Sequence, residues 1–158
     1  MAFAQRRARA RTIGILTRQP GIAALMLTLE ESLWDMEQKF WLEGSDFHAR
    51  NLTDDAVLLL PQPAGVLARD AAVAWVRETL PWTGVRFGGR RVLRLHDRVV
   101  LLAYNASAHR RKELTTYRAL VSSVYVNRDG DWRRTFHQQT VDEVLSGSTG
   151  RFELLKEP

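Results

Sequence analysis

The spacing of apolar residues changes once along this chain, near Val85, and this change constrains the fold more than any other feature. Before it, apolar residues such as Ile22, Met26 and Leu29 recur at steps of three and four, which is the spacing of one helix face. After it, apolar and polar residues alternate, as they do in strands with one buried face. The chain therefore predicts helices first and an antiparallel sheet second, an α+β arrangement.

The helical half is expected to contain one long helix and two short ones. The long helix begins near Pro20, whose fixed φ suits a first helical turn, and ends at Gly44. The remaining elements of this half are expected over residues 45–51 (helix), 56–60 (strand), 61–66 (tight connection) and 69–79 (helix).

The second half is expected to form four antiparallel strands, over residues 90–95, 98–108, 113–126 and 132–140. Asp129 and Gly130 form an Asp-Gly pair, which favours a two-residue hairpin turn between the last two strands. A sheet of this length that curves around one long helix makes a cone, and the open end of a cone is a natural pocket.

The composition narrows the chemistry that the chain can support. A length of 158 residues fits one domain with a sizeable core. The absence of cysteine excludes disulfides, thiolate catalysis and cysteine-ligated metal. The four histidines show no metal-ligand spacing, so neither a metal nor another cofactor is expected. No apolar run approaches the roughly 18–20 residues of a membrane span, and a cytoplasmic location is expected.

The positive net charge comes from the first residues of the chain. Residues 1–19 contain five arginines and no acid. Removing those five from the 23 basic residues leaves 18, which equals the 18 acidic residues. The rest of the chain is therefore formally neutral, and nucleic acid is not an expected partner of it. We expect residues 1–20 to form a basic flexible arm, with packing on a partner subunit or contact with nucleic acid or membrane as alternatives. The domain is expected over 21–144 and a tail over 145–158.

Three segments of the chain resemble a known family. They are LWDMEQKFWLEGSDFHARNLTDDAVLLLP, GVLARDAAVAWV and YVNRDGDWRRTFHQQT, and they cover most of the chain up to residue 140. They resemble the SnoaL-like branch of the nuclear transport factor 2-like (NTF2-like) superfamily, in particular its small bacterial domains of unassigned function. The resemblance implies a conical α+β fold with one long and two shorter helices in a strongly curved, mostly antiparallel sheet. It also implies a homodimer formed through the outer face of that sheet.

The same superfamily includes ketosteroid isomerases, whose catalytic groups have no counterparts here. The position of the isomerase base aspartate holds Leu60, and a leucine cannot take a proton. The second aspartate would fall near Ser122, and the tyrosine would fall near Met36 or Glu37. Isomerisation of that kind is therefore not expected.

The alignment with the isomerase places Ser122 toward the interior of the cone. Alternation along the strand then gives Arg118 and Leu120 the same orientation. On the last strand, the resemblance places one set of alternating residues inward: Trp132, Arg134, Phe136, Gln138 and Thr140.

The opposite strand phase carries the residues expected on the outer face of the sheet. These include Tyr117, Val121, Tyr125 and, on the last strand, His137. The set is apolar and aromatic on the earlier strand, unlike a solvated face. Burial against a second copy of the sheet would explain it, so these four residues are predicted to form the homodimer interface.

The candidate ligand-binding residues are Trp34, Trp41, Tyr104, Arg118, Leu120, Ser122, Phe136 and Gln138. Arg118 carries the sharpest expectation. An inward arginine needs a carboxylate such as that of Glu31 or Glu37, or a bound anion, because an unpaired buried charge is very costly. If Arg118 instead lies at the surface, it needs neither a carboxylate partner nor a bound anion.

Two functions from different classes fit this pattern. The first is a dimeric cone that binds a small apolar or acidic molecule without transforming it, through a largely apolar pocket with few polar groups. The alternative is a SnoaL-like cyclase, dehydratase or isomerase with a non-standard acid/base pair, in which Arg118 acts as the electrophile and either Glu37 or His137 is the candidate catalytic base. An assembly domain with a filled cone is a third interpretation.

Overall fold

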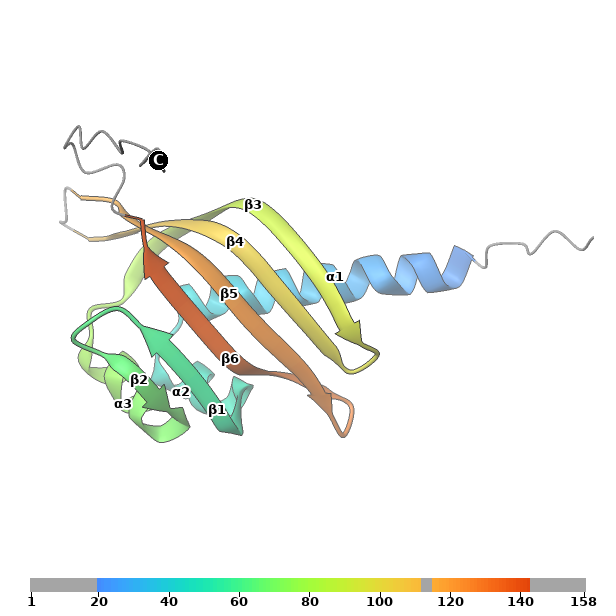
Figure 1. The fold of residues 1–158 in the computed structure, drawn as a ribbon, viewed down its shortest axis with the longest axis horizontal. Helices are drawn as coiled ribbons and strands as arrows, with labels where there is room; N and C mark the ends of the chain where they lie inside the picture. The colour runs from blue at the N-terminus through green and yellow to red at the C-terminus, as the bar shows by residue number, and fades with distance from the viewer. Residues whose placement is uncertain (1–19, 112–114, 143–158) are drawn as a thin grey trace, which may run out of the picture.

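The computed structural model describes residues 20–111 and 115–142, with side chains from residue 28 on. Three helices lie against one six-stranded sheet (Figure 1). The helices are α1 (Pro20–Leu42), α2 (Ser45–Asn51) and α3 (Arg69–Glu78). The strands are β1 (Leu52–Leu60), β2 (Gly65–Ala68), β3 (Trp82–His96), β4 (Val99–Arg110), β5 (Tyr117–Arg128) and β6 (Asp131–Val141). The predicted α+β class is confirmed, while most of the predicted basic arm and the whole tail lie outside the described residues.

The sheet is mostly antiparallel, as predicted, and its strand order is β2-β1-β6-β5-β4-β3. The single parallel pair joins β1 to β6. One strand was not expected, because β2 occupies part of the segment predicted as a tight connection and pairs with β1. The chain reverses before it at Gly65, whose φ of 71° is a conformation that glycine adopts without steric cost.

The long helix α1 lies along the concave side of the curved sheet, and α2 and α3 close the same side next to β1 (Figure 1). Its buried face brings Leu33 and Phe40 against Leu102 of β4 and Tyr125 of β5. A second apolar cluster forms around Trp41 near the end of α1. The apolar stripe predicted for this helix therefore packs into the sheet, and its polar face remains exposed.

The predicted orientation of β5 is wrong. Val121, Ser123 and Tyr125 are buried on the concave side, whereas Arg118 and Leu120 are exposed on the other side. Alternation shows that two sets exist but does not say which set faces the helix. The prediction took that choice from Ser122, whereas the burial of the apolar and aromatic set against α1 decides it.

The predicted orientation of β6 is right only in its first half, because the strand contains a bulge. Tyr125 pairs with Arg134 and the neighbouring Val124 pairs with Phe136, so Thr135 is an extra residue on β6. Arg134 and His137 are consequently both buried on the concave side. Beyond the bulge, every side chain of β6 points to the face opposite to the predicted one.

These two corrections also change the predicted interface. Tyr125, Val121 and His137 are buried inside the protomer, and Tyr117 packs against Trp41. An outer-face interface built from these four residues is therefore wrong.

No helix in the described part of the chain is long and apolar enough to cross a membrane.

Candidate functional site

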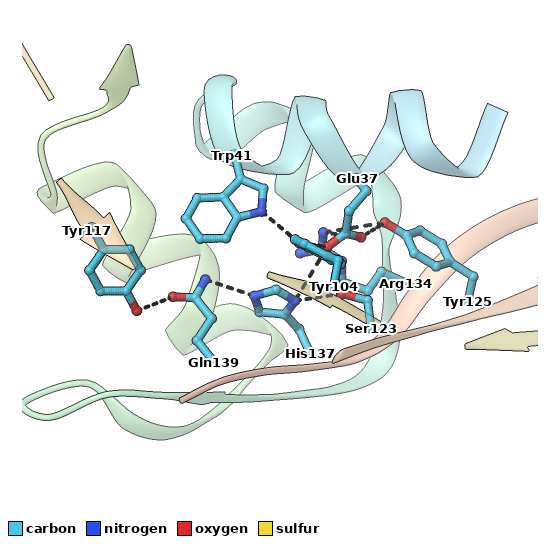
Figure 2. A network of polar contacts seen from close by, with 9 residues as sticks. All are labelled: Glu37, Trp41, Tyr104, Tyr117, Ser123, Tyr125, Arg134, His137 and Gln139. Carbon is cyan, nitrogen blue, oxygen red and sulfur yellow. Dashed lines mark hydrogen bonds and ion pairs between the residues drawn. The ribbon is translucent and has the colours of Figure 1, made fainter. Parts of the chain in front are cut away.

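A buried ion pair lies at the centre of the cone, between α1 and β6 (Figure 2). The Glu37 carboxylate and the Arg134 guanidinium are 2.8 Å apart from Oε2 to Nη2, and their side chains are 0% and 2% exposed. Burying two charges costs several kcal/mol for each ion, and mutual attraction offsets this only when further hydrogen bonds complete the site. The remaining contacts of Glu37 supply those bonds.

Three hydroxyl groups donate hydrogen bonds to the Glu37 carboxylate. Tyr104 and Ser123 donate to Oε1 at 2.5 and 2.8 Å, and Tyr125 donates to Oε2. Burial alone would raise the pKa of Glu37, but the charge of Arg134 and these hydrogen bonds hold the pKa below its usual value. Glu37 is therefore an ionised carboxylate whose lone pairs are occupied.

The arginine that pairs with Glu37 is not the one that the sequence suggested. Arg118, the predicted partner, is exposed on the convex side. Arg134 takes its place, with its guanidinium carbon 3.5 Å from the centroid of the Phe40 ring. The acid itself was detectable, because Glu37 lies one turn from both Leu33 and Trp41 within the apolar stripe of the helix.

A chain of hydrogen bonds runs from Glu37 to the edge of the site, and we call it the polar chain (Figure 2). It consists of Glu37, Ser123, His137, Gln139 and Tyr117. Ser123 Oγ lies 2.8 Å from His137 Nδ1, and His137 Nε2 lies 2.9 Å from Gln139 Nε2. The Tyr117 hydroxyl donates to Gln139 Oε1 at 2.8 Å.

The imidazole within the polar chain is neutral. Burial and the charge of Arg134 lower the pKa of His137 to about 3, and the opposing effect of Glu37 does not compensate. The two candidate catalytic residues of the sequence are thus brought together, with 3.8 Å between Glu37 Oε1 and His137 Nδ1.

The outer end of the polar chain lines a cavity of about 220 Å³. We call it the cone cavity; the residues used below are Trp41, Trp75, Trp82, Tyr117, His137 and Gln139. Its walls are aromatic on several sides. Polar groups of β5 and β6 line it together with a few others such as Arg110 and Glu43, which is the composition of a small-molecule site. Its volume lies below the roughly 300–1,000 Å³ of sites for drug-sized ligands, so it suits a small molecule.

A second hollow, of about 410 Å³, lies at the other end of the sheet between α1 and the β5–β6 turn. It is lined by residues such as Met36, Arg50 and Trp132, and no member of the polar chain lines it. The cone cavity is the better candidate site, because it combines aromatic walls with buried polar groups.

Of the predicted ligand-binding residues, Trp41 lines the cone cavity. Tyr104 lies behind it and accepts a hydrogen bond from Trp41 Nε1 at 2.8 Å. Trp34 packs against Tyr104 and Phe87. The residues that do not line the cavity and point to the convex side are Arg118, Leu120, Ser122, Phe136 and Gln138.

The residues that sequence reasoning missed are Ser123, Arg134 and Gln139 as site members, and Tyr117 as a cavity residue. Gln139 and Tyr117 belong to strand phases that the sequence assigned to the outer face. A bulge without a glycine leaves no local signal, so the position of His137 and Gln139 on the concave side could not be read from the sequence.

In the described ranges, no group of three or more His, Asp or Glu side chains is arranged to hold a metal ion.

No protein-family model matches the sequence, and no curated protein matches it. Solved structures do match its fold. An NTF2-like protein of unknown function from Pseudomonas putida superposes with a TM-score of 0.63 at 12% identity, over 86% of this chain and 98% of that one. The association domain of C. elegans CaMKII gives a TM-score of 0.61 at 11% identity, over 75% and 96% of the two chains. A putative ketosteroid isomerase from Parabacteroides distasonis gives 0.59 at 12% identity, over 83% and 96%.

These similarities show that the chain has the NTF2-like cone fold, as the sequence predicted. The similar proteins include an isomerase by its name, an association domain and proteins of unknown function. One fold therefore carries several functions, and the function must be argued from the site.

Proposed function

We propose that this chain is a small-molecule-binding cone domain and that its binding site is the cone cavity. The observation that carries the proposal is the combination of Trp41, Trp75 and Trp82 as apolar walls with Tyr117 and Gln139 as polar groups. Large rigid aromatic surfaces beside a few oriented polar groups provide both binding energy and orientation for a small ligand.

Binding without reaction is favoured over the acid/base alternative. A general base works best when its pKa lies near the working pH, and the pKa of His137 is lowered to about 3. Glu37 is fully buried and its oxygens already accept four bonds. Neither of the two candidate bases is therefore suited to abstract a proton from a ligand.

A ligand-retention experiment tests this proposal. The protein is purified under native conditions, and small molecules are released by denaturation and identified by mass spectrometry. Ala64 lines the cavity, so Ala64→Phe should fill it and abolish retention of a compound that the parent protein carries. Ala74→Phe on the exposed side of α3 is the matched control and should retain that compound. Equal retention by both variants would contradict a site in the cone cavity.

We also propose that a second copy of the chain covers the convex face of the sheet. The strand registers place Leu93, Leu101, Val124, Phe136 and Val57 side by side across five strands. Leu93 is 57% exposed and Val57 is 38% exposed. We call this set the convex row.

Two further observations support self-association through the convex row. The described helices all lie on the concave side, so the convex row faces outward (Figure 1). Apolar patches of this kind mark interaction surfaces. Proteins with a similar fold include two named as association domains, one of them putative.

A further inference from the structure

The ionised Glu37 fixes the direction of the first bond in the polar chain. A carboxylate can only accept hydrogen bonds, so the 2.8 Å contact with Ser123 requires the serine hydroxyl to be the donor. A serine hydroxyl has one proton, which this bond uses. Ser123 Oγ can therefore only accept in its second contact, the one with His137.

The state of the histidine follows from that constraint. Because Ser123 accepts, His137 Nδ1 carries the proton and donates across the 2.8 Å contact. The imidazole is neutral, since burial lowers its pKa to about 3. Nε2 then bears a lone pair and must accept in its own contact.

The orientation of the Gln139 amide follows in turn. His137 Nε2 accepts, so the Gln139 atom 2.9 Å away is the amide nitrogen. The amide oxygen therefore faces the Tyr117 hydroxyl, which donates to it at 2.8 Å. All four bonds of the polar chain point from Tyr117 toward Glu37 (Figure 2).

This direction determines which polar groups remain for a ligand. Gln139 uses one amide N–H for His137 and keeps the second. Tyr117 uses its only proton for Gln139, so its oxygen offers lone pairs. Burial raises the pKa of Tyr117 to about 12, so the hydroxyl stays protonated. Both residues line the cone cavity, so together they present one donor beside one acceptor, in a lining that also contains the charged groups of Arg110 and Glu43.

We infer that the cone cavity selects a neutral ligand whose polar end carries both a hydrogen-bond acceptor and a hydrogen-bond donor, such as a primary carboxamide, over the corresponding carboxylate. The inference rests on the proposed function, because it concerns the ligand of the same cavity. The acceptor of the ligand meets Gln139 N–H, and its donor meets the Tyr117 oxygen.

A carboxylate is disfavoured at this position because it has no proton to donate. One of its oxygens would therefore face the lone pairs of Tyr117. Two guanidinium groups of the lining would favour an acid. The charge of Arg134 is balanced by Glu37 at 2.8 Å, but its buried Nε has no hydrogen-bond partner in the described part of the chain. The Arg110 guanidinium lies 3.9 Å from the centroid of the Trp82 ring. The experiment must therefore compare an amide with an acid directly.

The first test needs no ligand. Two-bond ¹⁵N–¹H spectra of the uniformly labelled protein at pH 7 report which ring nitrogen of each histidine is protonated. His137 is expected as the neutral Nδ1–H form. An Nε2–H form or an imidazolium would reverse or break the polar chain and would overturn the inference.

The second test uses three probes of nearly equal shape, titrated into the protein while the indole ¹⁵N–¹H signals of Trp41, Trp75 and Trp82 are followed. The probes are 2-naphthamide, which donates and accepts, 2-acetylnaphthalene, which only accepts, and 2-naphthoate, which is an anion. We expect 2-naphthamide to bind about fivefold more tightly than 2-naphthoate, with 2-acetylnaphthalene between them, since one well-placed hydrogen bond contributes about 1 kcal/mol.

Two variants separate the donor from the acceptor. Tyr117→Phe should lower the affinity for 2-naphthamide to that for 2-acetylnaphthalene and leave the latter unchanged. Gln139→Met should weaken 2-acetylnaphthalene severalfold. Gln138→Met, on the same strand but on the convex side, is the matched control and should change neither affinity.

The outcomes distinguish the two proposals. If 2-naphthoate binds as tightly as 2-naphthamide or more tightly, the cavity is a binding site but the inference about its ligand is wrong. Probe binding with unchanged affinities in Tyr117→Phe and Gln139→Met would likewise overturn the inference and leave the binding site in place. If none of the three probes shifts the cavity tryptophans of the parent protein, both the proposed function and this inference fall.

Discussion

The two faces of the sheet reverse the usual relation between polarity and burial. The concave face is enclosed within the protomer, yet it carries Arg134 and His137, which face Glu37 of α1. The convex face is open in the protomer, yet Leu93 and Val57 of the convex row lie on it. The comparison shows that a buried charge is tolerated where an opposite charge and hydrogen-bond donors surround it, as they do the Glu37 carboxylate, although Arg134 Nε is left without a hydrogen-bond partner among the described residues. Apolar residues at a surface instead indicate that something covers them.

The largest expected effect comes from removing one charge of the buried pair. Arg134→Met leaves the Glu37 carboxylate buried without a cation, and we expect a loss of about 3–5 kcal/mol in the free energy of unfolding. Urea denaturation followed by tryptophan fluorescence measures it. Arg118→Met, on the exposed convex side, should change stability by less than about 0.5 kcal/mol. A loss below about 1 kcal/mol in Arg134→Met would show that the pair is not buried as described.

The second prediction concerns the pH dependence of stability that the buried His137 on the concave face should produce. The folded pKa of His137 is about 3, below the ordinary histidine value of 6.5, so the unfolded chain binds more protons between these values. Stability should therefore rise with pH from about 3 to 6.5 and be lower by about 2 kcal/mol at pH 5 than at pH 7.5 for this residue alone.

Urea denaturation at the two pH values checks this expectation. His48 has a folded pKa of about 4 and adds a dependence of the same sign. His137→Gln should remove part of the slope, whereas Gln138→Met, on the convex side of the same strand, should leave the slope unchanged. An unaltered slope in His137→Gln would mean that the imidazole is protonated in the folded protein.

The third prediction addresses the open face. Phe136→Glu places a charge within the convex row and should weaken self-association at least tenfold, or about 1.4 kcal/mol. Sedimentation velocity over a range of protein concentrations measures the change. Ala74→Glu, on the exposed side of α3 and away from the convex face, is the control and should leave association nearly unchanged. A parent protein that stays monomeric at all concentrations would refute the proposed interface.

The smallest expected effect compares two neighbouring serines on opposite faces. Ser123 donates to Glu37 and is fully buried, so Ser123→Ala should destabilise the protein by about 1–2 kcal/mol. Ser122 is half-buried on the convex side, and Ser122→Ala should fall within about 0.5 kcal/mol of the parent. Thermal unfolding of the two variants in parallel gives the difference in stability. Equal losses of stability would contradict the assignment of the two serines to opposite faces of β5.

The type of each element could be predicted from the sequence, because the periods of 3.6 and 2 reflect which side chains share a face. The long helix with Glu37 inside its apolar stripe and the Asp129-Gly130 hairpin both follow from local patterns. The strand β2 did not, because four residues are too few for a period to show.

The orientation of the strands could not be predicted, and the candidate site depends on it. Both faces of β5 carry apolar residues, so alternation alone cannot choose between them. On β6 the extra residue Thr135 changes the phase partway along the strand. Trp41 as a cavity residue and Glu37 as an acid within the helix stripe were within reach of sequence reasoning, whereas the position of His137 beside Glu37 and the role of Arg134 required the tertiary structure.

The extra residue at Thr135 has a consequence for how the interior of such a protein can change over time. It allows one strand to direct Arg134 to the helix and, three positions later, His137 to the cavity. Deleting one residue there would exchange the lining of the cavity for the side chains now outside, with the helix untouched. Gain or loss of a single codon thus changes which side chains of β6 line the cone cavity in one step, without a series of point substitutions.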